Sequence, residues 1–197
     1  MEVNLSRLGD IAVIKTGYNF NRPSTSPQKD LKDIKIISPK DISANGTINE
    51  AALNKMPLPQ LKDMYFLKPN DILFVGKGNF NVALVNQEIK AVPSSSFYKI
   101  QITDHNFTSE YVYAFLKFHL DILTRNSRQS TERIATLTLI ELSDIDIPLI
   151  PLAKQQQLKR IVDCQQKELE ILEKLKHNLN LFTKGIFTQI IKEHING

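Results

Sequence analysis

Short apolar runs separated by turn residues dominate the chain up to about Ile147. Five of these runs have the length and the β-branched or aromatic content of strands: residues 11–14, 34–37, 72–75, 82–85 and 97–102. Asn45-Gly46 and Lys68-Pro69-Asn70-Asp71 are typical of the turns between strands. Strands this short and irregular do not suit repeated strand–helix–strand units, so the pattern predicts a mixed or antiparallel sheet.

One helix interrupts this run of strands. Thr108 or Ser109 can cap its N-terminus, and Glu110 falls in its first turn. Apolar residues then recur at helical spacing, at Tyr111, Phe115, Phe118 and Ile122. This spacing predicts a helix over residues 109–122.

The pattern changes after Pro151, where apolar residues begin to recur every three or four positions. Residues 153–192 as one helix would be about 60 Å long at roughly 1.5 Å per residue. So long and narrow a stripe indicates a coiled coil that needs a partner, and the alternative is a helix folded back on its own domain. The stripe consists of Leu158, Val162, Gln165, Leu169, Leu172, Leu175, Leu179, Phe182 and Ile186.

The predicted fold class is therefore α+β. Residues 1–150 are expected to form a mixed or antiparallel β domain with a few helices, and residues 151–197 a long C-terminal coiled-coil helix.

Composition narrows the class of protein. A hydrophobic share of 42% in 197 residues suits one globular core, and no apolar run approaches the roughly 20 residues of a membrane-spanning helix. The N-terminal residues lack a basic start and an apolar signal core, and Cys164 is the single cysteine. We therefore expect a cytoplasmic protein without a membrane partner.

The formal net charge of +4 is mild and does not by itself indicate nucleic acid. Residues 1–150 contain 17 Lys and Arg against 16 Asp and Glu, and residues 151–197 contain 8 against 5. Basic residues gather locally at Lys117, Arg125, Arg128 and Arg133. Such a group is either a solvated surface or a contact with an anionic partner.

The sequence contains no glycine-rich phosphate loop, no nucleophile in a recognisable motif and no spacing of His, Cys and carboxylates that suits zinc. One alternative is a Mg²⁺-dependent nuclease of the Pro-Asp … Glu-x-Lys kind, with Asp71, Glu88 and Lys90. In such a site two carboxylates hold the metal and the lysine polarises water or phosphate. Our main expectation is that the chain has no catalytic residues and binds no metal.

Four blocks in the chain resemble, in order, those of type I restriction-modification specificity subunits. The first block resembles the opening of a target recognition domain, the third its Asp-Ile-Leu strand, and the fourth the Pro-rich segment that opens the family's long helix. Ile150 and Lys154 stand where the family often has proline and an acid. The blocks are residues 8–18, 36–48, 67–75 and 147–156.

The resemblance implies a half-subunit, because full-length members have two recognition domains and two long helices. It implies that the chain binds double-stranded DNA, joins methyltransferase subunits and a restriction and translocase subunit, and pairs with a second copy of itself. The methyltransferase, and not this chain, would bind S-adenosylmethionine and flip the target adenine. A detached recognition domain of a fused methyltransferase is an alternative, as is a coiled-coil adaptor that binds no DNA.

Three segments have the side chains expected of DNA contacts. Asn pairs with adenine and Arg with guanine in the major groove, and a glycine-rich loop lets the backbone approach phosphates. The alternative for each segment is an ordinary solvated loop. The candidate residues are Tyr18, Asn19, Asn21 and Arg22 in the first segment, Lys77, Asn79 and Asn81 in the second, and Arg125, Arg128, Gln129 and Arg133 in the third.

Overall fold

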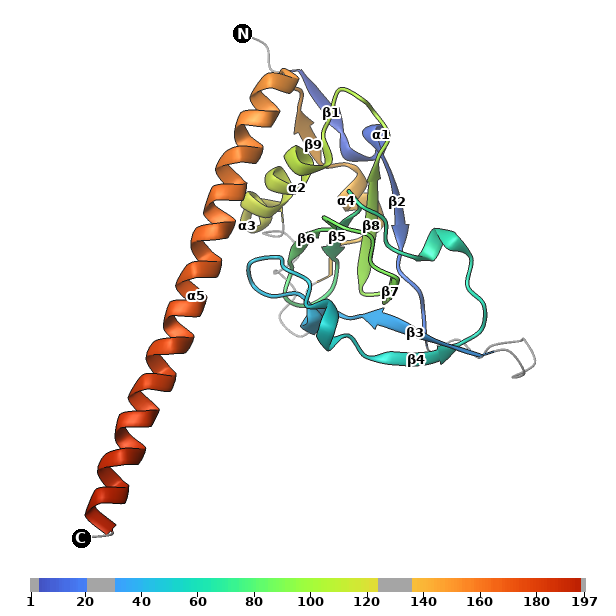
Figure 1. Cartoon of the computed structure of the whole chain (residues 1–197). Coiled ribbons are helices and arrows are strands. Elements are labelled where there is room, and N and C mark those ends of the chain that lie inside the picture. The colour runs from blue at the N-terminus through green and yellow to red at the C-terminus, as the bar shows by residue number, and fades with distance from the viewer. Residues whose placement is uncertain (1–3, 21–30, 124–135, 196–197) are drawn as a thin grey trace. The chain divides into compact units, whose positions relative to one another are not determined.

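The computed structural model describes residues 4–20, 31–123 and 136–195, which divide into two compact units (Figure 1). The first unit extends to Lys159 and the second begins at Arg160. The first unit is an α+β domain, and the second consists of one helix.

A four-stranded antiparallel sheet forms the centre of the first unit. Its strands are β2 (Ala12–Thr16), β8 (Phe97–Ile102), β5 (Ile72–Val75) and β6 (Val82–Leu84), in that spatial order. The register places Ile100 of β8 opposite both Ile14 and Ile72. All five predicted strands are therefore confirmed: four belong to this sheet, and the fifth, at residues 34–37, belongs to a second sheet.

A three-stranded sheet packs next to it, in the order β4 (Lys55–Leu58), β3 (Lys32–Ile37) and β7 (Ala91–Pro93). β3 pairs antiparallel with β4 and parallel with β7, so the predicted mixed pairing is confirmed. A further antiparallel pair joins β1 (Leu5–Arg7) to β9 (Asp146–Pro148). The pattern did not predict β1, β4, β7 or β9, because they have only three or four residues and three of them contain a proline, which weakens a strand signal.

The four-stranded sheet is covered on both faces. All four residues of β5 are buried, which is expected of a strand with packing on both sides. One face holds Leu73, Val75 and Phe97, which pack with Ile37 of the three-stranded sheet. Helix α2 (Ser109–Phe118) lies against β6 on the other side, as Figure 1 shows.

The helices of the first unit are short. The Thr108 hydroxyl caps α2 by accepting from the Tyr111 N–H, as predicted, but α2 ends before His119 and α3 (Leu120–Leu123) follows. The other short helices are α1 (Leu8–Ile11), α4 (Leu139–Ser143), and the 3₁₀ turns η2 (Pro39–Asp41), η3 (Glu50–Ala52) and η4 (Asp63–Tyr65).

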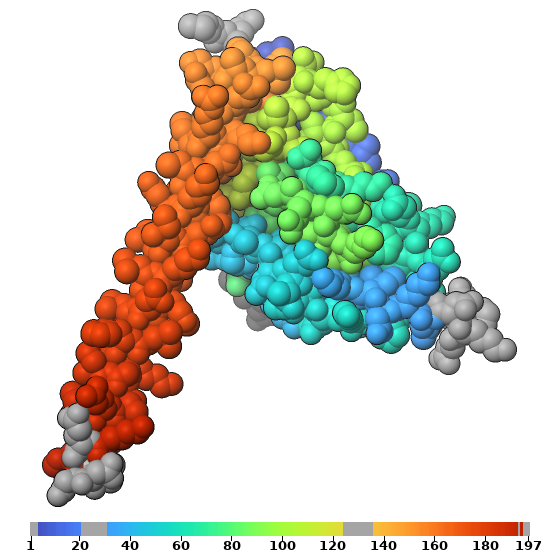
Figure 2. Space-filling view, viewed as in Figure 1, coloured from blue at the N-terminus to red at the C-terminus, as the bar shows by residue number. Residues whose placement is uncertain are grey.

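Helix α5 (Leu152–Ile195) confirms the prediction of one long helix after Pro151. From Arg160 onward it constitutes the second unit, orange to red in Figure 2. Leu172, Leu175, Leu179 and Phe182 of the predicted stripe are each more than half exposed. Within the described ranges no helix, α5 included, is long and apolar enough to cross a membrane.

The first two turns of α5 belong to the first unit, where the side chain of Gln155 is fully buried. Its amide oxygen accepts from the Thr108 N–H at 2.8 Å. Its amide nitrogen donates to the carbonyls of Asn106 at 2.7 Å and Ile150 at 2.9 Å. One side chain thus joins the start of α5 to the segment that begins α2.

We predict that Gln155→Ala lowers the free energy of unfolding by about 1–3 kcal/mol, because one buried N–H and two carbonyls lose their partner. Gln156→Ala is the matched control, since Gln156 is exposed, and should change stability by less than about 0.5 kcal/mol. Urea denaturation of both variants measures the difference. Equal stability of the two variants would contradict the role of Gln155.

Candidate nucleic-acid interface

Two of the three predicted segments begin at the same end of the four-stranded sheet. β2 and β5 both run antiparallel to β8, so the C-terminal ends of β2 and β5 lie at the N-terminal end of β8. The Gly17 N–H donates to the Phe97 carbonyl, and the Gly76 N–H donates to the Ser96 carbonyl, each at 2.9 Å. The residues after Gly17 and after Gly76 therefore leave the sheet on either side of β8.

Tyr18 is an anchor in the first segment. Its N–H donates to the Pro93 carbonyl at 2.7 Å, and its ring packs 5.2 Å from the rings of Phe20 and Tyr65. The next residue, Asn19, is exposed. Tyr18 thus holds the segment against the core and leaves Asn19 at the surface. Asn21 and Arg22 lie outside the described residues.

The second segment presents Lys77 and Asn79, both exposed. Gly76 before them is buried, and a side chain there would meet the Tyr98 ring at 2.4 Å. Gly78 has φ +83°, which glycine adopts without strain. Gly76 therefore permits close packing at the strand end, while Gly78 forms the turn that separates the two exposed side chains.

Asn81 has a different environment, because both ends of its amide are engaged within the chain. Its nitrogen donates to the Ser43 carbonyl and its oxygen accepts from the Val82 N–H, each at 2.9 Å. This side chain connects the second segment to the turn at residues 43–47. We therefore give Asn81 a positioning role instead of a base contact.

Thr136 and Leu137, which follow the third segment, lie at the same end of the sheet. Thr136 forms an antiparallel bridge with Lys77, and the Leu137 N–H donates to the Gly76 carbonyl at 3.0 Å. The Tyr98 hydroxyl donates to the Leu137 carbonyl at 3.0 Å. The candidates of this segment precede Thr136 and lie outside the described residues: Arg125, Arg128, Gln129 and Arg133.

Asp71 of the nuclease alternative has a structural role. It is buried, and its two oxygens accept from the Lys68 N–H at 2.9 Å and from the Gln101 amide at 2.8 Å. The Lys99 ammonium lies 3.6 Å from the same carboxylate and donates to the Met64 and Phe66 carbonyls. Burial lowers the pKa of Lys99, and the charge of Asp71 opposes that shift.

Glu88 and Lys90, by contrast, are exposed. They line a surface hollow of about 460 Å³ that Asp71 does not line. The remaining charged residues around this hollow are Asp33, Lys35, Glu50 and Lys55, of which Lys35 and Glu50 form an ion pair at 2.8 Å. Among the described residues, no three His, Cys, Asp or Glu side chains are grouped so that they could hold a metal ion.

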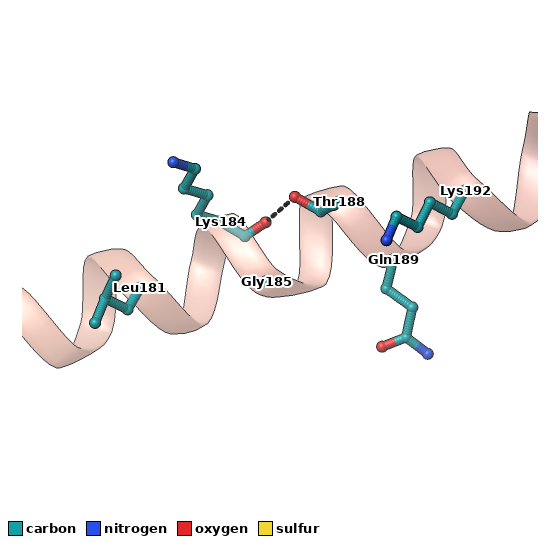
Figure 3. Close-up of a pocket in the computed structure, with 6 residues that line it drawn as sticks. All are labelled: Leu181, Lys184, Gly185, Thr188, Gln189 and Lys192. Atoms are coloured by element: carbon teal, nitrogen blue, oxygen red, sulfur yellow. Dashed lines mark hydrogen bonds between the residues drawn. The ribbon is translucent and has the colours of Figure 1, made fainter.

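A second hollow, of about 490 Å³, lies on α5 where Gly185 has no side chain (Figure 3). Its six lining residues all come from this one helix, and the Thr188 hydroxyl donates to the Lys184 carbonyl at 2.8 Å. Residues of a single helix cannot enclose a ligand. The candidate site is therefore the end of the four-stranded sheet at which the described parts of the first two segments and Thr136 lie.

The sequence matches the family of type I restriction modification DNA specificity domains over residues 1–190. The structure is similar to a chain of a type I R-M system studied for its complex assembly and conformational transition, with a TM-score of 0.62 and 17% identity over 86% of this chain. It is also similar to the HsdS subunit from Thermoanaerobacter tengcongensis, with a TM-score of 0.56 and 17% identity over 87% of this chain. The type I restriction-modification S subunit from M. genitalium has a TM-score of 0.56 and 13% identity over 92% of this chain.

The chain spans only 39%, 39% and 43% of the lengths of these three proteins. At such identities the likeness establishes the fold, with the α+β domain and the long helix that the sequence predicts.

We predict that Asp71→Ala destabilises the protein by about 3 kcal/mol, because it leaves the buried ammonium of Lys99 without its counter-ion. Glu88→Ala and Lys90→Ala should each change the free energy of unfolding by less than about 0.5 kcal/mol. Chemical denaturation tests both statements. DNA cleavage by the purified chain with Mg²⁺, abolished by Glu88→Ala, would contradict this assignment and restore the nuclease alternative.

Proposed function

The chain belongs to the family of type I restriction modification DNA specificity domains, and from this membership we propose that it is a half-size subunit that reads DNA sequence and has no catalytic residues of its own. It directs partner methyltransferase subunits to a target that contains adenine. A restriction and translocase subunit joins this complex when the DNA is cut.

The observation that supports this proposal most is that the residues after Gly17 and after Gly76, together with Thr136, lie at one end of the four-stranded sheet. Asn19, Lys77 and Asn79 are exposed there, and Thr136 forms a bridge with Lys77. Amides and arginines read base edges in the major groove, while lysines contact phosphates. A sheet buried on both faces holds such loops in fixed positions.

S-adenosylmethionine belongs to the methyltransferase subunits in this proposal. The target adenine must leave the base stack to reach their active site. This chain contributes the position on the DNA and the helix to which those subunits bind.

Co-expression with a type I methyltransferase subunit tests the function. We expect the two proteins to purify together and to bind one DNA sequence more tightly than others of equal length. A stable complex without sequence preference would contradict the reading of DNA and favour the alternative of a coiled-coil adaptor.

We further propose that two copies of the chain pair through α5. The stripe that includes Leu158, Leu172 and Ile186 is exposed, and burying it removes apolar surface from water. A second copy supplies the same stripe and, with it, the second recognition domain.

The charges of the helix favour an antiparallel pair. Residues 160–173 contain four acids and two basic residues, whereas residues 174–192 contain four lysines and no acid. Antiparallel packing places each half beside the opposite charge of the other copy, and parallel packing places like charges together. A two-fold axis near residues 173–174 satisfies this arrangement and implies a target made of inverted half-sites.

Apolar residues of α5 outside the predicted stripe form a further exposed surface to which the methyltransferase can bind. Phe187 and Ile191 are exposed, and at about 100° per residue they lie to one side of the row formed by Leu179 and Ile186. We assign this additional surface to the methyltransferase subunits.

We predict that Lys77→Ala weakens binding of all DNA sequences to a similar degree, because a phosphate contact carries no sequence information. Arg22→Ala or Arg128→Ala should cost about 1–3 kcal/mol on the target alone if the arginine reads a guanine. Lys90→Ala is the control. Titration of target and unrelated duplexes measures each effect, and unchanged binding with Arg22 and Arg128 both replaced would remove these loops from the interface.

We predict that Leu172→Glu with Leu179→Glu makes the chain monomeric, because unpaired carboxylates are strongly unfavourable in a buried seam. Leu181→Glu is the matched control, since Leu181 is equally exposed but lies off the stripe. Light scattering gives the mass, and circular dichroism checks that the domain stays folded. The pair would be excluded if the mass of the wild type corresponds to a single copy of this chain, both for the chain alone and for its complex with methyltransferase.

A further inference from the structure

The turn at residues 43–47 is fixed to the rest of the first unit from two sides. Asn81 donates to its Ser43 carbonyl, and the Lys117 ammonium at the end of α2 donates to its Asn45 carbonyl at 2.6 Å. Gly46 has φ +81°, and a side chain on it would lie 2.5 Å from the Val82 carbonyl. The turn is therefore held directly beside the segment that presents Lys77 and Asn79.

The Lys117 ammonium and the Tyr113 hydroxyl have more donor hydrogens between them than the acceptors that they contact. The Lys117 ammonium lies 2.9 Å from the Tyr113 hydroxyl and 5.4 Å from the centre of its ring. An ammonium can only donate, so the phenol oxygen accepts this bond, and its own hydrogen points elsewhere. Within the described ranges, no carboxylate pairs with Lys117 and no acceptor receives the Tyr113 hydrogen.

Both groups also keep the protonation states that suit an anion. Burial raises the pKa of Tyr113 to about 12, so the phenol remains a neutral donor. Burial lowers the pKa of Lys117, so a nearby negative charge would favour the ammonium that burial disfavours. A half-buried cation and an unused hydroxyl hydrogen at one point suit a doubly coordinated oxyanion.

We propose that Lys117 and Tyr113 bind a phosphate of the DNA backbone, next to the loop at residues 76–81. The phosphate is the counter-ion that the described part of the chain does not supply to Lys117. It fixes the position of the DNA relative to the bases that Asn79 and its neighbours meet. This inference rests on the proposed function, because the phosphate belongs to the bound duplex.

Lys117→Met tests the contact, since methionine keeps most of the length of the side chain without the charge. The full chain in its methyltransferase complex is titrated with target and unrelated duplexes over a range of salt concentrations. Loss of one phosphate contact lowers the slope of log affinity against log salt by about 0.9, equally for both duplexes. Tyr113→Phe, which removes only the hydroxyl, should weaken both duplexes by a smaller factor. Lys55→Met, on a strand of the other sheet, should leave the slope unchanged.

The salt slope separates this role from a structural one. If Lys117 only held the turn, Lys117→Met would lower the melting temperature and leave the slope as in the wild type, which would overturn the inference. Inorganic phosphate that raises the melting temperature of the wild-type complex but not of Lys117→Met, with an unchanged slope, would assign the site to free phosphate and also overturn it. A wild-type complex without sequence preference would refute the proposed function instead.

Discussion

The buried amide of Gln155 is the interaction on which the arrangement of the recognition domain depends. It makes three hydrogen bonds to the backbone, one of them to the N–H of Thr108, the residue that caps α2. The position of α2 in turn determines where Lys117 donates to the turn at residues 43–47. Asn81 joins this turn to the loop at residues 76–81. A series of hydrogen bonds between side chains and the backbone thus extends from the first turns of α5 to a surface that we assign to DNA.

The sheet serves as a fixed scaffold and the loops as the contact surface, because the sheet is buried and the loops are exposed. β5 is buried along its whole length, and Asp71 before it is fully hydrogen-bonded, so the strand has no freedom to adapt to a ligand. The loops after β2 and β5 begin at glycines that permit close packing. The exposed residues of these loops can be substituted without disturbing the core. Such an arrangement lets one scaffold present different recognition residues.

The sequence predicted the strands with clear apolar runs, the single long helix and the α+β class, because these depend on local periodicity. It did not predict β7 or β9, whose three residues acquire strand pairing only from their partners β3 and β1. Asn81 shows the same limit in the site: its acceptor, the Ser43 carbonyl, lies 38 residues away, so no local pattern separates it from Asn79. In the sequence Lys117 is one of several basic residues, and nothing local indicates its contact with Asn45, which spans 72 residues. The exposed apolar residues beyond the predicted stripe, such as Phe187, did not follow its spacing.

In the proposed function, one recognition domain reads DNA as part of a symmetric pair. Selection of bound duplexes from a random double-stranded library by the complex with methyltransferase tests it most directly. We expect enrichment of two identical, inverted half-sites separated by a spacer of constant length. Enrichment of a single asymmetric sequence would contradict the pair, and a library that emerges without enrichment would contradict sequence reading itself.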